Sequence, residues 1–341
     1  MEKKKLLLID LTIMEDFCNL QCKYCGHEKF KIDKQNIITY KPHSELHKIL
    51  NSTMEMVHKN IDAPVLKISG GEIFMIDGIL DFIKEQSRNF PLIQILTNAT
   101  MLNENSLNEL QELGNIIFQV SLDGHTFEMN QNRFKTEAQF NRVRKNIQSL
   151  LDKGFAVEIN TVIHPSNIKS MRSFMDYLAG LDGKIRVFPY PVRWVDNFDI
   201  DKEDIKIFRE IFNSEKYKKI MPLNQYMEEL IECLEKKRTS PCFTPNVILG
   251  ISESGSIRKC ACGISGPNLI SESTNFNKVI EPIVPGKGNV FISDLCNTCF
   301  TNYEFYNLLL SSDNKTENME QLFFDIEKPI LNRLMELKES R

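Results

Sequence analysis

The sequence lacks the features that would place a protein in or across a membrane. No apolar run reaches the roughly 18 residues that a membrane-spanning helix needs. The basic start contains only a short apolar run, interrupted by Asp10, and therefore does not fit a signal peptide. We expect a protein of the cytoplasm that does not bind membranes.

A surplus of positive charge is also missing. The 341 residues carry a net charge of −4, which gives no electrostatic basis for binding nucleic acid or anionic lipid. With 42% apolar residues, the chain has enough core-forming material for one large domain, or for one domain and a smaller companion. These values exclude function classes but do not choose a function.

Apolar runs alternate with helical patterns over the first half of the chain. Each of the first five runs is followed by a helical pattern, and such alternation predicts an α/β fold with a parallel sheet. Six units are too few to close an eight-fold barrel, so we expect an open, partial (β/α)6 barrel. The expected strands are 5–13, 64–69, 93–98, 115–122, 156–163 and 184–190. The clearest helix is expected between Thr136, as N-cap, and Gly154.

The alternation stops after the sixth run, which suggests three parts. Residues 1–190 would form the barrel, and 191–240 a charged, helical linker that helps to shape the substrate site. Residues 241–341 would form a small cysteine-rich domain with a C-terminal helix, in which Ser254 and Gly255 make the turn of a β-hairpin.

Three of the nine cysteines stand directly after the first expected strand, in "CNLQCKYC". In a reducing compartment, clustered thiols are more often metal ligands or catalytic groups than disulfides. Three thiolates suit a 4Fe–4S cluster and leave one iron open to a small molecule. A zinc site formed by Cys18, Cys22, Cys25 and His27 is the alternative, although zinc sites usually show two closely spaced pairs.

The spacing Cys18-x3-Cys22-x2-Cys25, with Tyr24 before the last cysteine, resembles the signature of the radical S-adenosylmethionine (SAM) superfamily. The resemblance covers residues 1–190 and implies a partial (β/α)6 barrel with a SAM-binding 4Fe–4S cluster. It also implies an electron donor such as flavodoxin or ferredoxin. Further matches at the ends of the expected strands imply SAM contacts, with Arg133 on the carboxylate, "SGGE" on the amino group, and strand five on ribose and adenine. These residues are Ser69, Gly70, Gly71, Glu72, Asn98, Ser121, Asp123, Arg133, Asn160 and Val162, together with Tyr24.

A second group of cysteines begins at Cys242. The order Cys242-x12-Gly255-x4-Cys260, followed by "LCNTC", resembles the Twitch extension, the shorter relative of SPASM. The resemblance implies one auxiliary 4Fe–4S cluster with Cys242, Cys260, Cys296 and Cys299 as ligands. Four cysteines with one closely spaced pair also fit a structural zinc site.

Two cysteines remain outside these sets. Cys233 lies in a helical pattern and is expected to be a buried helix residue. Cys262 follows a presumed ligand by two positions and is a candidate catalytic residue, a thiol that donates hydrogen to a substrate radical. It would otherwise replace Cys260 as a ligand or be inert.

The resemblance implies reductive cleavage of SAM to a 5′-deoxyadenosyl radical that abstracts hydrogen from a substrate. Relatives with such extensions modify ribosomal peptides, activate sulfatases or oxidise aminocyclitols. Our leading hypothesis is epimerisation, crosslinking or oxidation of a ribosomally made peptide. The first strand begins at residue 5, without room before it for a leader-binding domain, so a small-molecule dehydrogenase of the aminocyclitol type is the alternative. A structural zinc-binding protein is the remote one.

Overall fold

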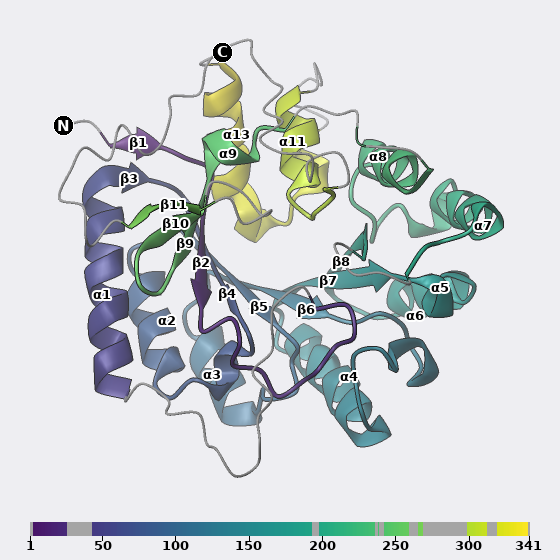
Figure 1. The fold of residues 1–341 in the computed structure, drawn as a ribbon, viewed down its shortest axis with the longest axis horizontal. Helices are drawn as coiled ribbons and strands as arrows, with labels where there is room; N and C mark the ends of the chain where they lie inside the picture. The colour runs from purple at the N-terminus through teal and green to yellow at the C-terminus, as the bar shows by residue number, and fades with distance from the viewer. Residues whose placement is uncertain are drawn as a thin grey trace.

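A computed structural model describes residues 3–25, 43–192, 198–235, 238, 242–258, 265–268, 299–311 and 319–339. Within these residues the central feature is a nine-stranded sheet in the order β11-β10-β9-β2-β4-β5-β6-β7-β8. Figure 1 shows helices α1 to α4 on one side of this curved sheet, with the C-terminal helices α11 and α13 on the other. The candidate functional residues lie at the edge of this curved sheet and on its inner face.

Six parallel strands confirm the predicted barrel, and they pair in chain order. They are β2 (Leu8–Ile13), β4 (Val65–Gly70), β5 (Leu92–Thr97), β6 (Ile116–Ser121), β7 (Ala156–Ile163) and β8 (Lys184–Pro191). The helices that cover them are α1 (His43–Asn60), α2 (Ile79–Ser87), α3 (Glu104–Gln111), α4 (Glu137–Asp152), α5 (Pro165–Ile168) and α6 (Met171–Ala179). The pattern therefore predicted each of these strands to within a few residues.

Helix α4 begins and ends where its sequence predicts. The Thr136 hydroxyl accepts from the Gln139 backbone N–H at 3.3 Å, and Gly154 follows the helix with φ +80°. The Gln139 side chain, which a capping box would aim at Thr136, instead accepts from the Lys135 backbone N–H at 3.0 Å. Local capping chemistry thus fixes both ends of the helix.

The predicted hairpin is present, but it also extends the barrel sheet. Strands β9 (Ile248–Ser252) and β10 (Ser256–Arg258) are antiparallel, and Gly255 turns between them with φ +82°. Strand β11 (Ser265–Asn268) pairs with β10. Strand β9 pairs in parallel with β2, so the expected boundary near residue 241 separates strands of one sheet. The division into three parts remains a prediction.

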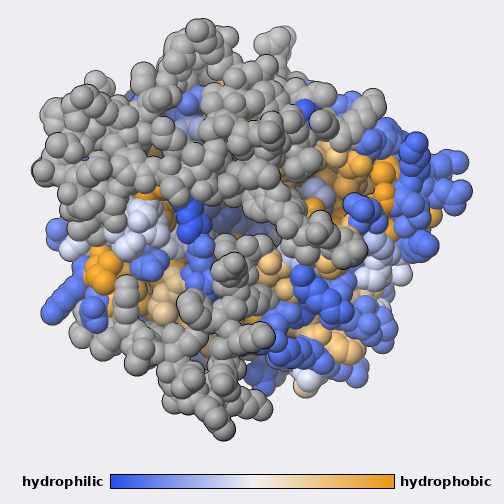
Figure 2. All heavy atoms as spheres, in the orientation of Figure 1, coloured by the Kyte–Doolittle hydropathy of each residue, from blue (hydrophilic) through white to orange (hydrophobic). Residues whose placement is uncertain are grey.

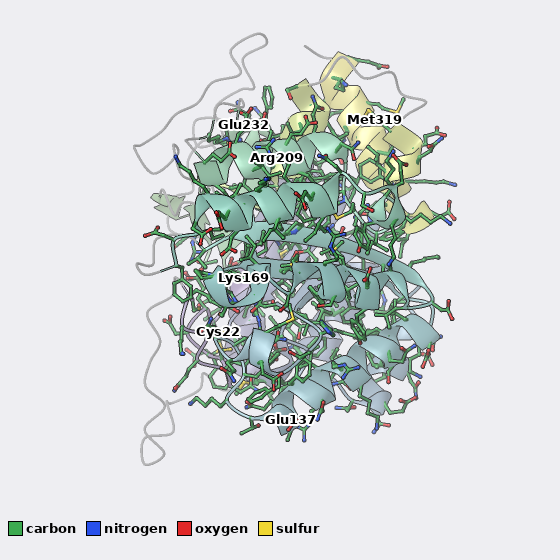
Figure 3. The ribbon with its side chains drawn as sticks, turned by 90° about the vertical axis from the view of Figure 1, so that its right-hand side faces the viewer. Cys22, Glu137, Lys169, Arg209, Glu232 and Met319 are labelled. Atoms are coloured by element: carbon green, nitrogen blue, oxygen red, sulfur yellow. The ribbon has the colours of Figure 1, made fainter. Side chains whose placement is uncertain are left out.

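The charged linker forms two helices, α7 (Lys202–Phe212) and α8 (Asn224–Glu235). Ile205, Phe208 and Ile211 bury one face of α7. Figure 2 shows the other face as a hydrophilic rim at the right-hand edge, with hydrophobic residues inward of it. Figure 3 shows the two helices packed side by side, with Arg209 on α7 and Glu232 on α8 labelled. Arg209 pairs with Glu235 at 3.1 Å.

The remaining described elements are short or C-terminal. They are β1 (Lys4–Lys5), which pairs with β3 (Ile61–Asp62), and the helices α9 (Thr244–Val247), α11 (Glu304–Ser311) and α13 (Lys328–Glu339). The 3-10 turns are η1 (Ile73–Met75), η2 (Glu128–Asn130), η3 (Glu215–Tyr217), η5 (Glu320–Leu322) and η6 (Asp325–Glu327). None of the described helices has both the length and the apolarity to cross a membrane.

A belt of polar side chains runs across adjacent strands on the inner face of the sheet, where barrels usually carry branched apolar residues. The C-terminal segment partners this belt: Glu327 contacts Arg186 at 2.6 Å, and Arg186 also pairs with Glu158. The Tyr306 hydroxyl accepts from Gln94 at 3.3 Å. The belt comprises Asp10, Lys67, Gln94, Gln119, Glu158 and Arg186.

Candidate active site

The three clustered cysteines lie in one loop that follows β2. Cys18, Cys22 and Cys25 are all partly exposed. The Leu20 backbone N–H donates to Cys18 Sγ at 3.4 Å, and the Cys25 N–H donates to the Cys22 carbonyl at 3.2 Å. Figure 3 labels Cys22 at the lower left of the molecule, away from Met319 and the C-terminal helices at the upper right. The loop thus presents three thiols at the carboxyl edge of the sheet.

The glycine motif after β4 supports this loop from behind. The Gly71 N–H donates to the Met14 carbonyl at 3.3 Å, and the Glu72 N–H donates to the Phe17 carbonyl at 2.8 Å. A Cβ at Gly71 would lie 2.0 Å from the Phe17 oxygen, next to Cys18. The glycines are therefore required where two protein backbones meet, a role that the sequence did not indicate.

Glu72 is buried and joins the ends of β4 and β5. Its carboxylate accepts from the Thr97 hydroxyl at 2.7 Å and from the Asn98 N–H at 2.7 Å. Burial raises the pKa of Glu72 to about 7, although these hydrogen bonds oppose the shift. Its described contacts place Glu72 in the framework of the site, and a role toward the SAM amino group remains a prediction for the motif.

Asn98 contacts the cysteine loop directly. Its side-chain amide donates to Asn19 Oδ1 at 3.0 Å and to Cys18 Sγ at 3.8 Å. Its Oδ1 accepts from the Thr100 N–H at 2.9 Å, which orients the amide. Asn98 therefore lies beside the first cysteine, and its expected contact with SAM remains a prediction.

Tyr24, Asp123 and Arg133 form a buried cluster that interacts electrostatically with the second cysteine, Cys22. Arg133 donates to both Asp123 oxygens, at 3.0 Å each, and the Tyr24 hydroxyl also donates to this carboxylate. Burial raises the pKa of Tyr24 well above its ordinary value. The Asp123 carboxylate also accepts from the Val162 N–H at 2.9 Å. Arg133 is thus engaged by Asp123, and its predicted contact with the SAM carboxylate is untested.

A partly open cavity of about 210 Å³ reaches the glycine motif. Ser69, Gly70 and Asn160 line it together with residues of β2, β5, β8 and β9. Asn160 is only 3% exposed, and its Oδ1 has no hydrogen-bond partner. Ser121 lies opposite Asn160 in the β6–β7 register. An unsatisfied buried acceptor, in a residue that lines a cavity, would suit a ligand hydroxyl such as that of a ribose.

The cavity has a polar wall that the sequence motifs did not indicate. The Tyr303 hydroxyl donates to Asp10 and accepts from Lys67 at 3.1 Å, while Ser69 donates to Asp10 at 3.0 Å. At the same cavity, Arg258 pairs with Glu15. The sequence does contain a sign of this wall, because one charged residue lies inside each of two apolar strands: Asp10 in "LLLIDLTI" and Lys67 in "VLKIS".

The second cysteine group is described only in part. Cys242 and Cys299 lie within the described residues, whereas Cys260, Cys262 and Cys296 lie outside them, as does His27. Thr244 and Thr301, each two positions after a described cysteine, line the cavity. Cys233 is a half-buried residue of α8, and burial raises the pKa of its thiol to about 11.

The donor set of the cysteine loop can be compared with the needs of an iron–sulfur cluster. A 4Fe–4S cube binds one cysteine at each of its separate irons. Thiolates are the ligands that iron–sulfur clusters require, so the donor set of Cys18, Cys22 and Cys25 fits this cofactor.

Comparison with known protein families matches residues 12–178 to the radical SAM superfamily. The chain carries a radical SAM domain. Enzymes of this superfamily bind a 4Fe–4S cluster and SAM, so the family match agrees with the chemistry of the cysteine loop.

Two curated relatives resemble the chain over stretches that exceed the matched radical SAM domain. The subtilosin biosynthesis protein AlbA of Bacillus subtilis (strain 168) is 25% identical over 253 residues, which are 72% of this chain and 52% of AlbA. Neomycin C epimerase of Streptomyces fradiae is 24% identical over 180 residues, 52% of this chain and 54% of the epimerase. The chain therefore spans about half the length of these relatives.

A solved structure of Streptococcus suis SuiB bound to the precursor peptide SuiA shares the fold. The TM-score is 0.60 at 14% identity, and the match covers 90% of this chain and 74% of SuiB. The likeness extends beyond the radical SAM domain, because this coverage exceeds residues 12–178.

Proposed function

We propose that this protein is a radical SAM enzyme that abstracts hydrogen from a substrate held inside the barrel. The cavity carries this proposal, because one space touches the glycine motif, the open acceptor of Asn160 and the segments that follow Cys242 and Cys299. Cofactor and substrate sites would therefore be adjacent. When bound, the cluster and SAM supply a 5′-deoxyadenosyl radical.

The protein residues divide into holding and positioning roles. Cys18, Cys22 and Cys25 would hold the SAM-binding cluster, and Gly70 and Gly71 would hold the loop close to β4. Asn160 would accept a hydrogen bond from the SAM ribose. The buried Tyr24–Asp123–Arg133 cluster would fix the third cysteine, because its charges are paired and shielded from water.

An auxiliary cluster beside the cavity completes the proposal. Cys242 and Cys299 would ligate it together with Cys260 and Cys296. The flanking Thr244 and Thr301 reach the cavity wall, which would bring the cluster near the substrate. An electron donor such as flavodoxin or ferredoxin would reduce the SAM-binding cluster from solution.

A ribosomally synthesised peptide is the leading substrate class. AlbA is named for the biosynthesis of a bacteriocin, and SuiB is seen with a precursor peptide. The outcome would be epimerisation, crosslinking or oxidation. A cytoplasmic site of action fits a substrate modified before export.

A small polar molecule is the second candidate, and the cavity wall favours it. Asp10, Lys67, Tyr303 and Asn160 offer hydrogen-bonding groups suited to hydroxyls and amines. The similarity to neomycin C epimerase points the same way. If the substrate is a peptide, the same wall predicts a polar side chain at the reacting residue.

Anaerobic reconstitution tests the proposal. We expect about eight irons per chain, and about four after Cys18, Cys22 and Cys25 are replaced together by alanine, because each cluster contributes four. The triple variant should form no 5′-deoxyadenosine from SAM with dithionite. Formation at the wild-type rate would refute the assignment, and a matched Cys233→Ala variant should keep both iron and activity.

A further inference from the structure

Two parts of the chain that are distant in sequence meet around one buried ion pair. Arg238 is 7% exposed and contacts Glu304, which is 1% exposed, at 2.6 Å. Arg238 also donates to the Cys299 carbonyl at 3.4 Å. Its charge acts on the thiols of Cys242, Cys299 and Cys233. A full positive charge and a full negative charge are therefore fixed beside two presumed cluster ligands.

Asn307 ties the Cys242 segment to α11. Its Oδ1 accepts from the Phe243 N–H at 3.0 Å, which fixes the orientation of the amide. Its Nδ2 then donates to Cys242 Sγ at 3.9 Å and to Glu304 at 3.2 Å. Asn307 is 2% exposed, so this N–H···S contact does not compete with water.

We infer that Arg238, Glu304 and Asn307 set the reduction potential of an auxiliary iron–sulfur cluster held by Cys242 and Cys299. The inference rests on the proposed function. Adding an electron makes a cluster more negative, so a nearby cation favours the reduced form and a nearby anion opposes it. A hydrogen bond to a ligating sulfur also favours reduction. Burial keeps these effects unscreened by salt.

The arrangement suits a cluster that accepts an electron from the substrate side of the cavity. Arg238 and Asn307 both favour the reduced form, while Glu304 limits the shift. The three residues are therefore positioning residues for electron transfer and do not contact the reacting atoms.

Redox titration followed by electron paramagnetic resonance tests this inference. The full chain with Cys18, Cys22 and Cys25 replaced by alanine should carry the auxiliary cluster alone, which gives an unmixed signal. In this background, Glu304→Gln should raise the midpoint potential by about 59 mV or more, a tenfold change in the one-electron equilibrium. The reason is that the remaining guanidinium stays charged.

The double variant Arg238→Gln with Glu304→Gln should return the potential close to its starting value, because both charges are gone. A general loosening of the structure would not raise the midpoint potential in Glu304→Gln and restore it in the double variant. Asn307→Leu, which keeps the ion pair, should lower the potential and serves if a charge variant fails to fold. Asn146→Leu is the matched control, since Asn146 of α4 is also buried and donates to the carbonyls of Ala99 and Leu102.

The outcomes test the auxiliary cluster and the tuning of its potential separately. Absence of iron from the cysteine-triple background would overturn the auxiliary cluster itself, and with it this inference. Full iron with potentials that do not move in Glu304→Gln and Asn307→Leu would overturn the inference alone. Shifts of one sign in Glu304→Gln and in Asn307→Leu would also contradict it.

Discussion

Replacing Gly71 by alanine tests how the glycine motif acts on the cysteine loop. The new Cβ would lie 2.0 Å from the Phe17 oxygen, whereas ordinary contact begins at 3.4 Å. The two backbones must therefore separate by roughly 1.4 Å. That movement would break the hydrogen bonds from Gly71 to Met14 and from Glu72 to Phe17.

The cost follows from these contacts. Two backbone hydrogen bonds contribute about 0.5–1.5 kcal/mol each, and an overpacked site costs about 1–3 kcal/mol. We expect Gly71→Ala to lose about 3 kcal/mol of unfolding free energy in the apoprotein, combining these two terms. Because Cys18 follows Phe17, reconstituted iron should fall by up to about four per chain.

Denaturant unfolding and iron analysis check this expectation together. Gly180→Ala is the matched control, since its Cβ would meet atoms no nearer than 3.5 Å, and it should keep both stability and iron. If Gly71→Ala kept its iron and stability but bound SAM more weakly, the glycine would serve ligand approach instead of loop support. Unchanged iron, stability and SAM affinity would refute both explanations.

Three further predictions concern a buried carboxylate, the polar belt and a thiol. The pKa of Glu72 in the folded protein lies near 7, above its ordinary 4.5, so the folded protein binds this proton more tightly than the unfolded chain does. The unfolding free energy should therefore fall by about 3 kcal/mol as the pH rises from 4.5 to above 7. Glu72→Gln should flatten this dependence of stability on pH, and an unchanged dependence would show that Glu72 does not cause it. Arg186→Met leaves Glu158 and Glu327 buried without their cation and should destabilise by about 3–5 kcal/mol, measured by urea unfolding; a loss below about 1 kcal/mol would show that water reaches the belt. Cys262→Ala, at a position outside the described residues, should abolish the incorporation of solvent deuterium into an epimerised product while SAM cleavage continues. Loss of iron from this variant would show that Cys262 is a cluster ligand. Full product formation would show that its thiol takes no part in the reaction.

Local patterns predicted what depends on neighbouring residues. Alternation located the six parallel strands, and the Thr136 cap with Gly154 located α4, because burial and capping act over a few positions. The helical pattern expected after the fifth strand instead divides into two helices, α5 and α6. Its divided form depends on packing that the periodicity does not record.

The missed features depend on distant partners. Strand β9 joins β2 across more than 230 residues, and nothing within "VILGIS" specifies that neighbour. Tyr303 reaches Asp10 over a separation of 293 residues. The sequence predicted the cysteine loop and the motif positions, whereas the contact between Gly71 and Phe17 became visible only in three dimensions.

The pairing of Arg186 with Glu327 has a consequence for synthesis on the ribosome. Every strand of the parallel series is translated well before Glu327, so Arg186 lacks this buried partner until residue 327 has emerged. An inward guanidinium and the neighbouring carboxylate then stay hydrated, which keeps the nascent barrel loosely closed. We therefore expect final tightening of the barrel to be a late event in synthesis, and a chain that stops before Glu327 to be loosely packed around Arg186.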